Sequence, residues 1–262
     1  MPKRALPFVL AASNFGTMIV NHLDEHKSSN GSYGVGWQIL QNGSFDENEI
    51  NTCLGILNLR KQYFGDGVFV LDCGANIGVH AINFAKHLES LGGGVLSFEA
   101  QERIYYALAG NIALNNCFNA RAIHAALANP SKKGESLEFL TPDYTKNASF
   151  GSLELKQNQN SEFIGQELSR KEKVPLLKLD FFDFERVDFI KIDVEGMEFQ
   201  LLKGGIKCLE KHKPILQVEI IKSDLKEIKT LLLKLGYKIF EAGINILAIH
   251  ESDPSLNHIK SS

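Results

Sequence analysis

The stretch VFVLDCGANIGVHAINFA, residues Val68–Ala85, decides the fold class of this chain. It opens with VFVLD, five residues that have the pattern of a buried strand ending on a carboxylate. Two glycines follow, Gly74 and Gly78, and the apolar residues after them have helical spacing. A strand, a glycine-containing turn and a helix in this order begin the alternation that characterises α/β folds.

Strand and helix patterns continue to alternate along the rest of the chain. The strand patterns are GVLSFE (94–99), RAIHAAL (121–127), VDFIKID (187–193), PILQVEI (214–220), YKIFEA (237–242) and INILAIH (244–250). Helices are expected between most of them, among them one that starts near Ile77 and one over EGMEFQLLKGG (195–205). The alternation predicts a mostly parallel sheet with helices on both faces. A turn at Ala242-Gly243 should join the last two strands into an antiparallel hairpin at one edge.

The first sixty residues are the least regular part of the chain. We expect residues 1–60 to form an N-terminal extension or cap, in front of a ligand-binding domain that spans 61–262. Within the extension, Asp46 should cap a helix that ends at Phe64.

A second irregular stretch, Ser131–Glu172, is long and polar, and a connection of that length is either functional or disordered. Its core, NASFGSL (147–153), suits a lid over a site. A mobile surface excursion is the alternative interpretation.

Composition narrows the classes of partner. The 262 residues can bury a large core without disulfides or metals, and a formal net charge of −3 with no basic block argues against nucleic acid. No apolar run reaches the length of a membrane span. The four cysteines have no metal-ligand spacing and are expected to be reduced thiols in a cytoplasmic protein. MPKRALPFVLAAS at the N-terminus is similar to a short signal peptide, but Pro7 interrupts the apolar run, so export is not expected.

The glycine turn after the first strand is the expected ligand site, because ligands in open α/β sheets bind beyond the carboxyl ends of the strands. Gly74 and Gly78 should let a ligand approach the backbone, and the helix that follows points its free N–H groups at it. The spacing G-x-x-x-G matches neither the dinucleotide nor the P-loop fingerprint. Glu99 ends the next strand pattern, 21 positions beyond Gly78, where an acid accepts hydrogen bonds from ribose hydroxyls.

A ribose acid without a phosphate fingerprint indicates a nucleoside that carries no pyrophosphate. S-adenosylmethionine fits this description. Its carboxylate suits the helix N-terminus, and its ammonium and sulfonium groups suit acids such as Asp72.

Three segments together carry a family resemblance: FVLDCGANIGVHAINFA, LSFEAQERIYYALAGNIALNN and VDFIKIDVEGMEFQLLKGG. They resemble the FkbM-type methyltransferases, a branch of the class I S-adenosylmethionine-dependent enzymes, and the resemblance spans Val68–Ile249. It implies a Rossmann-like class I methyltransferase fold with seven strands, the last one antiparallel. It also implies methyl transfer, usually to a hydroxyl oxygen of a sugar or natural product.

The resemblance also assigns roles to individual positions. The positions that match cofactor motifs are Asp72, Gly74, Asn76, Gly78 and Glu99, and those that match the DVEG motif are Asp193 and Glu195. The family often has Pro where this chain has Ala100. It often has Asn where this chain has His124, before Ala125, and this change leaves the recognition of adenine open.

Carboxylates at strand ends are the first candidates for catalysis. Asp193 is expected near the transferred methyl group, where it could orient the acceptor hydroxyl, take its proton or bind the ammonium of the cofactor. Helix capping is the alternative role for Asp193 and Glu195. Glu219 ends the next strand and could meet Asp193 across the cleft; three carboxylates there could hold a divalent cation, but no spacing demands one and no metal is expected.

Three further polar residues are weaker candidates. His80 and His124 could act as bases, although a solvated or capping role for His80 and a packing or adenine-binding role for His124 fit better. Asn245, which opens the last strand, could face the acceptor.

Two other functions stay open at this point. One is a nicotinamide-dependent oxidoreductase or epimerase, against which the absence of G-x-G-x-x-G and of a Tyr-x-x-x-Lys pair counts. The other is a non-catalytic nucleoside-binding module of the same fold. The leading hypothesis is the S-adenosylmethionine-dependent methyltransferase, whose expected partner is a small-molecule or glycan acceptor. A homodimer stays open.

Overall fold

The computed structural model describes residues 6–28 and 31–259. Lys3 and Arg4, on which the signal-peptide interpretation depended, lie outside these ranges. Among the described residues, no helix is both long and apolar enough to cross a membrane.

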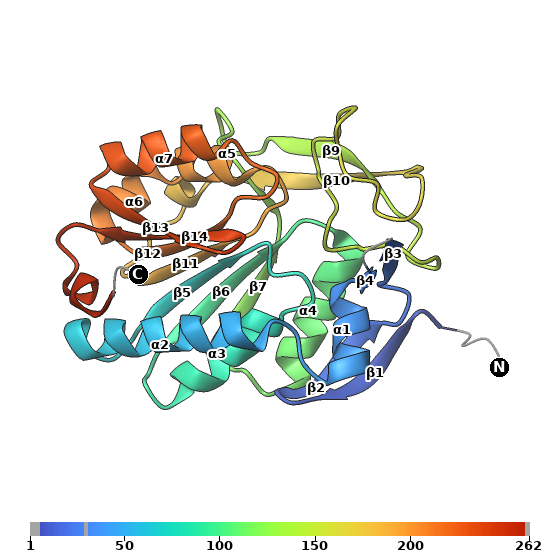
Figure 1. The fold of residues 1–262 in the computed structure, drawn as a ribbon, viewed down its shortest axis with the longest axis horizontal. Helices are drawn as coiled ribbons and strands as arrows, with labels where there is room; N and C mark the ends of the chain where they lie inside the picture. Colours follow the sequence, from blue (N-terminus) through green and yellow to red (C-terminus); the bar gives the residue numbers. More distant parts are fainter. Residues whose placement is uncertain (1–5, 29–30, 260–262) are drawn as a thin grey trace.

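A seven-stranded sheet forms the centre of the molecule (Figure 1). Its strands are β5 (Phe69–Cys73), β6 (Gly94–Glu99), β7 (Ala120–His124), β11 (Phe189–Ile192), β12 (Ile215–Glu219), β13 (Tyr237–Ala242) and β14 (Asn245–His250). They lie in the order β13-β14-β12-β11-β5-β6-β7, and β14 alone runs antiparallel to both of its neighbours. The prediction of a mostly parallel sheet with an antiparallel hairpin at one edge is confirmed.

Helices cover both faces of this sheet (Figure 1). On one face lie α2 (Glu47–Phe64), α3 (Val79–Glu89) and α4 (Glu102–Leu114), and on the other α5 (Glu198–Lys203), α6 (Ile206–His212) and α7 (Leu225–Lys234). Successive strand residues point to opposite faces. Val70 therefore packs in the cluster under α2 and α3, whereas Leu71 packs in the cluster under α5 to α7.

The N-terminal segment packs into the same core as the sheet. It contains a hairpin of β1 (Phe8–Ser13) and β2 (Gly16–Asn21), a short pair β3 (His26–Ser28) and β4 (Gly31–Tyr33), and helix α1 (Val35–Asn42). Asn111 of α4 accepts the N–H of Ile19 at 2.5 Å and donates to its carbonyl oxygen at 3.1 Å. Met18 and Ile39 are fully buried in the cluster that also contains Val70. Within residues 6–28 and 31–60, the N-terminal segment thus shares one hydrophobic core with the sheet.

The polar stretch Ser131–Glu172 is more regular than its composition indicates. It contains β9 (Ser136–Thr141) and the start of β10 (Arg170–Leu177), which pair antiparallel beside β8 (Ala126–Leu127). The expectation of an irregular segment is wrong at both ends, because the two strands satisfy each other's backbone groups across a long loop.

The connection after β11 also differs from its prediction. Residues 195–205 form a turn and then α5, which begins only at Glu198. The Glu198 side chain accepts the N–H groups of Val194 and Gly196 at 3.0 and 3.2 Å, so it holds the turn that precedes its own helix. Asp46 does occupy the N-cap position of α2, but its side chain makes no capping hydrogen bond.

A buried cluster of charges ties α2 to the sheet and to the C-terminal segment. Arg60 of α2 contacts Asp188 at 3.2 Å and also pairs with Asp253, and all three side chains are almost completely buried. Arg186 adds a second contact to Asp188 at 2.6 Å. The cluster joins three segments that are distant in the sequence.

The four cysteines are all free and buried. They are Cys53 in α2, Cys73 in β5, Cys117 just after α4 and Cys208 in α6. Burial raises the pKa of each thiol above its ordinary value.

Candidate active site

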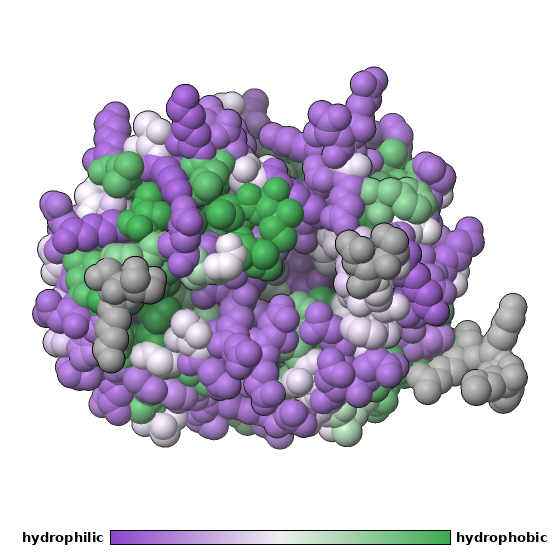
Figure 2. All heavy atoms as spheres, in the orientation of Figure 1, coloured by the Kyte–Doolittle hydropathy of each residue, from purple (hydrophilic) through white to green (hydrophobic). Residues whose placement is uncertain are grey.

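A cavity of about 250 Å³ lies at the carboxyl ends of the parallel strands, where the opening stretch of sequence was expected to bind a ligand. A hollow opens on the face shown in Figure 2, with hydrophobic side chains gathered on one side of it. The lining comes from the turns after β5, β6, β11 and β12, from residues 149–155 of the long loop, and from the first residues of α1 and α2. The NASFGSL core therefore covers the cavity, as a lid would, and its Phe150 is fully buried against the body of the protein.

The glycines of the opening turn serve the packing of the protein itself. Gly74 has φ +83°, and a Cβ there would lie 1.7 Å from the carbonyl oxygen of Asp193. Gly78 has φ +92°, and its Cβ would lie 2.7 Å from Leu108 of α4. Gly74 lines the cavity with its neighbour Asn76, whereas Gly78 does not. The expectation that both glycines open the backbone to a ligand is thus corrected for Gly78, which allows α3 and α4 to pack closely.

Gly74→Ala is expected to destabilise the protein by at least about 2 kcal/mol, because a Cβ at positive φ is strained and would also clash with backbone. Urea unfolding followed by circular dichroism measures this change. The control is Gly55→Ala in α2, where nothing lies within 4 Å of the added Cβ. That variant should gain up to about 1 kcal/mol from helix propensity. Equal stabilities of the two variants would contradict the packing argument.

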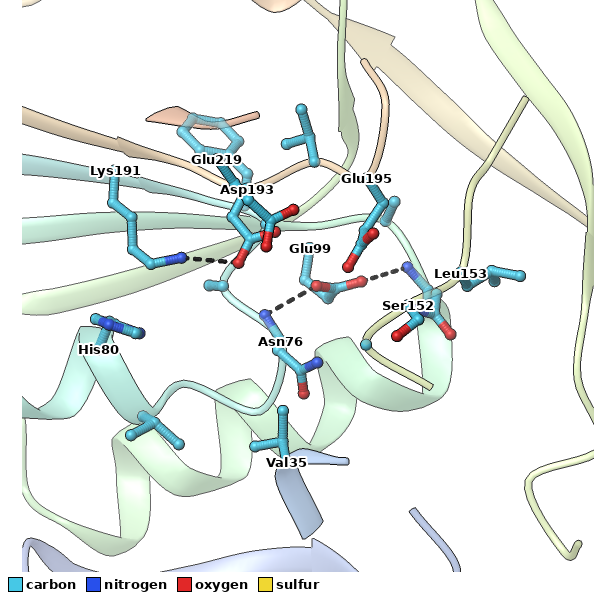
Figure 3. Close-up of a pocket in the computed structure, with 18 of the residues that line it drawn as sticks. Val35, Asn76, His80, Glu99, Ser152, Leu153, Lys191, Asp193, Glu195 and Glu219 are labelled. Atoms are coloured by element: carbon cyan, nitrogen blue, oxygen red, sulfur yellow. Dashed lines mark hydrogen bonds and ion pairs between the residues drawn. The ribbon is translucent and has the colours of Figure 1, made fainter. Parts of the chain in front are cut away.

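Glu99 is held at the end of β6 by the turn around it. Its carboxylate accepts the N–H of Asn76 at 3.0 Å (Figure 3). It also accepts the N–H of Gln101 at 2.8 Å. Burial raises the pKa of Glu99 to about 7, against the opposing effect of these hydrogen bonds. Since a carboxylate can accept about four hydrogen bonds, Glu99 keeps acceptor capacity for a ligand in the cavity.

A row of four polar side chains runs across the sheet below the cavity. Strand register places Ser97, Asp72, Lys191 and Gln217 side by side on β6, β5, β11 and β12. Asp72 is completely buried and does not line the cavity. Both of its oxygens lack a hydrogen-bond partner among the described residues. Burial raises the pKa of Asp72, and the charge of Lys191 opposes that effect. Asp72 was expected to contact a ligand directly, but in the structure it lies below the cavity lining.

The three acids predicted for catalysis lie together at the cavity. Asp193, Glu195 and Glu219 each offer a carboxylate oxygen, and these oxygens lie within 4.8 Å of one another. Lys191 contacts Asp193 at 3.0 Å, and Lys222 contacts Glu195 at 2.7 Å (Figure 3 shows the first pair). The prediction that Glu219 meets Asp193 is confirmed, whereas the absence of a metal there stays a prediction.

The environment of Glu195 and Glu219 favours their protonated forms. Burial, followed by the charge of Asp193, raises the pKa of Glu219 to about 8 and raises that of Glu195 as well. Glu195 also has φ 51°, a conformation that is strained outside glycine. Asp193 does not cap α5, because its side chain contacts Lys191 and the N-cap of α5 is Met197.

Of the two neighbouring residues His124 and Ala125, only Ala125 lines the cavity. Ala125 lines the cavity, as predicted for a cofactor-binding residue. The His124 ring stacks on Tyr105 and donates through Nε2 to the carbonyl oxygen of Ala100 at 2.9 Å. His124 is absent from the cavity lining, so its role here is to pack the end of β7.

The sequence did not reveal several polar residues of the cavity. Lys191 could have been noticed, since it stands two residues before Asp193 in a strand and therefore shares its face. Glu49 and Asp46 come from the N-terminal segment, and no motif marks them. His80, expected to be solvated or capping, is buried and lines the cavity.

Comparison with known proteins gives the family. A model described as the methyltransferase FkbM domain matches residues 72–239. Methyltransferase sdnD of Sordaria araneosa is 29% identical over 176 residues, which cover 58% of this chain and 64% of that protein. The chain thus spans less than two thirds of that relative.

Solved structures of similar fold were also found. The FkbM methyltransferase of Methylobacillus flagellatus KT has 16% identity and a TM-score of 0.48, covering 82% of this chain and 58% of that one. TYW2 of M. jannaschii, solved with AdoMet, has 12% identity and a TM-score of 0.45, covering 95% and 86%. The matched domain model covers more than half of the sequence, and the chain therefore belongs to the FkbM methyltransferase family.

Proposed function

We propose that this chain transfers a methyl group from S-adenosylmethionine to a hydroxyl oxygen of a small-molecule acceptor, such as a sugar, a glycan or another metabolite. One observation supports this most strongly. A single cavity contains Glu99, with acceptor capacity to spare, and the carboxylates of Asp193 and Glu219.

The residues present fit the cofactor. Glu99 would accept the ribose hydroxyls, and the turn at Gly74 and Asn76 would hold the amino-acid end. Apolar side chains that line the cavity suit the adenine ring: Phe98, Ala125, Leu127, Leu153 and Met197. S-adenosylmethionine, when bound, supplies an electrophilic methyl group on a sulfonium cation. The Asp193 carboxylate would stabilise a cation in this cavity.

The same carboxylates set the class of acceptor. Acidic residues outnumber basic ones in this part of the cavity lining. The acids are Asp46, Glu49, Asp193, Glu195 and Glu219, and the lysine is Lys191. The Glu49 carboxylate, which stays ionised, disfavours an anionic acceptor beside it, and ionised and protonated carboxyl groups alike can form hydrogen bonds with neutral hydroxyl groups. We therefore expect uncharged, hydroxyl-bearing acceptors.

Calorimetry with S-adenosylhomocysteine and with NAD⁺ tests the cofactor. Binding of the first and not of the second is expected, and the reverse result would favour an oxidoreductase. A panel of sugars, glycans, phenols and amines with radiolabelled S-adenosylmethionine tests transfer. Cofactor binding without any methylated product would favour a non-catalytic module.

Asp193→Asn is expected to lower kcat by at least about 100-fold on an acceptor from this panel, because the carboxylate orients the hydroxyl group next to the methyl. The Kd for S-adenosylhomocysteine should change less than about threefold. The control is Asp183→Asn, a fully exposed aspartate that pairs with Lys211 at the surface. If Asp193→Asn weakened cofactor binding as much as turnover, Asp193 would belong to the cofactor site.

A further inference from the structure

His80 lines the cavity, and its ring is buried and packed against aromatic side chains. Its side chain is only 8% exposed and lines the cavity from the first turn of α3. The ring contacts Phe45 edge to face at 6.5 Å between centroids and Phe84 at 5.7 Å. Its Nε2 lies 3.1 Å from Oε1 of Glu49. The distance is that of a hydrogen bond, although the ring N–H does not yet point straight at the oxygen, and such contacts often tighten on substrate binding.

Glu49 is itself fixed from a third element. Asn245, the first residue of β14, donates from Nδ2 to Oε2 of Glu49 at 2.9 Å. Burial alone would raise the pKa of Glu49, but the His80 ring, the charge of Lys191 and this amide outweigh burial and lower it to about 2. Glu49 therefore remains an anion that faces the imidazole.

Several other charged groups lie near this pair and act on it electrostatically. Asp46 lies at the start of α2, Lys191 lies in β11, and Asp193 directly follows that strand. Asp72 lies below on β5. Figure 3 shows His80 and Lys191 on the same side of the cavity.

His80 differs from the carboxylates in one respect. Asp193 and Glu195 are each paired with a lysine ammonium group. The imidazole instead contacts an anion on one ring nitrogen, and its other nitrogen, Nδ1, makes no hydrogen bond to any residue within 6–28 and 31–259. A ring held by an anion at Nε2–H keeps a free lone pair at Nδ1.

We propose that His80 is the general base that takes the proton of the acceptor hydroxyl, with Glu49 as the residue that positions it and Asn245 as the group that holds Glu49. This inference rests on the proposed methyl transfer to oxygen. It assigns the base to the N-terminal side of the cavity, whereas the sequence directs attention to the strand ends.

The acceptor oxygen forms a bond to the methyl carbon, and the electron pair of the broken C–S bond stays on sulfur. The hydroxyl proton moves to Nδ1 of His80. The resulting imidazolium is stabilised by the Glu49 carboxylate and later releases the proton to water.

Nitrogen NMR of the histidines in the complex with S-adenosylhomocysteine tests the arrangement without any acceptor. The signal that disappears in His80→Asn identifies the residue. The Nε2-protonated tautomer is expected at high pH, and its share should fall in Glu49→Gln, because the carboxylate that faces Nε2 is lost. The Nδ1-protonated tautomer in the wild type, or a tautomer ratio that ignores Glu49→Gln, would overturn the proposal.

Kinetics on an acceptor from the panel gives the second test. His80→Asn should lower kcat at least about 100-fold and remove the acid limb of its pH profile. The Kd for S-adenosylhomocysteine should stay within about threefold. The matched control is His87→Asn on the same helix, where the ring contacts Asn58 away from the cavity.

Two results would overturn the role of His80 and leave the methyl transfer intact. One is a His80→Asn variant that keeps wild-type kcat. The other is a variant whose affinity for S-adenosylhomocysteine falls as much as its kcat, which would make His80 a cofactor ligand. Failure of the proposed function itself is distinguishable, because the wild-type protein would then bind no S-adenosylhomocysteine or would methylate no acceptor of the panel.

Discussion

Glu99→Gln is expected to weaken the binding of S-adenosylhomocysteine by about 100-fold. Glu99 would accept two ribose hydroxyls, and a hydrogen bond to a charged group contributes about 1.5–3 kcal/mol. The amide removes the charge and turns one acceptor into a donor, which also faces the backbone N–H groups of Asn76 and Gln101. Calorimetry at pH 8 measures the loss.

The control for this change is Glu102→Gln, three residues further on. Glu102 lies on the outer side of α4 and accepts a hydrogen bond from Tyr106. It should keep wild-type affinity. If both variants bound the ligand like the wild type, the ribose assignment would be wrong.

The same residue predicts how binding depends on pH. Because burial raises the pKa of Glu99 to about 7, the carboxyl is increasingly protonated below that value. Ribose hydroxyls bind the ionised form better, so the Kd should rise by up to about tenfold for each pH unit below 7. Above pH 7 this dependence should disappear. Glu99→Gln should remove it throughout, and an identical pH profile in that variant would assign the titration to another group.

Arg60→Ala is expected to cause the largest loss of stability, about 3–5 kcal/mol, with a fall in Tm of about 10 °C. Arg60 is buried between Asp188 and Asp253, and its removal leaves Asp253 as an uncompensated buried charge. Arg186 continues to neutralise Asp188, which limits the damage on that side. Differential scanning calorimetry measures the change.

Arg121→Ala provides the comparison for Arg60. Arg121 is an exposed arginine on the edge strand β7. Its removal should change the free energy of unfolding by less than about 0.5 kcal/mol. Similar Tm values for the two variants would show that the buried cluster contributes little.

The fold was predictable because its signals are local. Each parallel strand is a short apolar run, and strand ends such as Glu99 and Asp193 must meet at one edge of a parallel sheet. The hairpin at Ala242-Gly243 follows from the turn residues. The strands β9 and β10 were missed because their pairing joins residues about thirty to forty positions apart, and their polar sequences carry little alternation.

The candidate site was predictable only in part, because some of its residues reach the cavity through packing between segments that are distant in the sequence. Glu219 could be placed beside Asp193 from strand order, and the structure confirms it. Glu49 reaches the cavity only because α2 packs across the sheet, and nothing in its own surroundings in the sequence indicates that. His80 was recognised as close to the turn, but the direction of its side chain depends on Phe45 and Phe84.

Because the four thiols are buried, the rate at which each reacts reports how often the structure around it opens. Thiolates are the reactive species, and Cys53, Cys73, Cys117 and Cys208 are all shielded in the closed structure. Alkylating reagents can therefore modify them only when the surrounding segment opens. Mass spectrometry of the order of labelling would rank α2, β5, the end of α4 and α6 by their opening free energies. Ligands that stabilise the cavity should slow the labelling of Cys73, which directly precedes Gly74, more than that of Cys208.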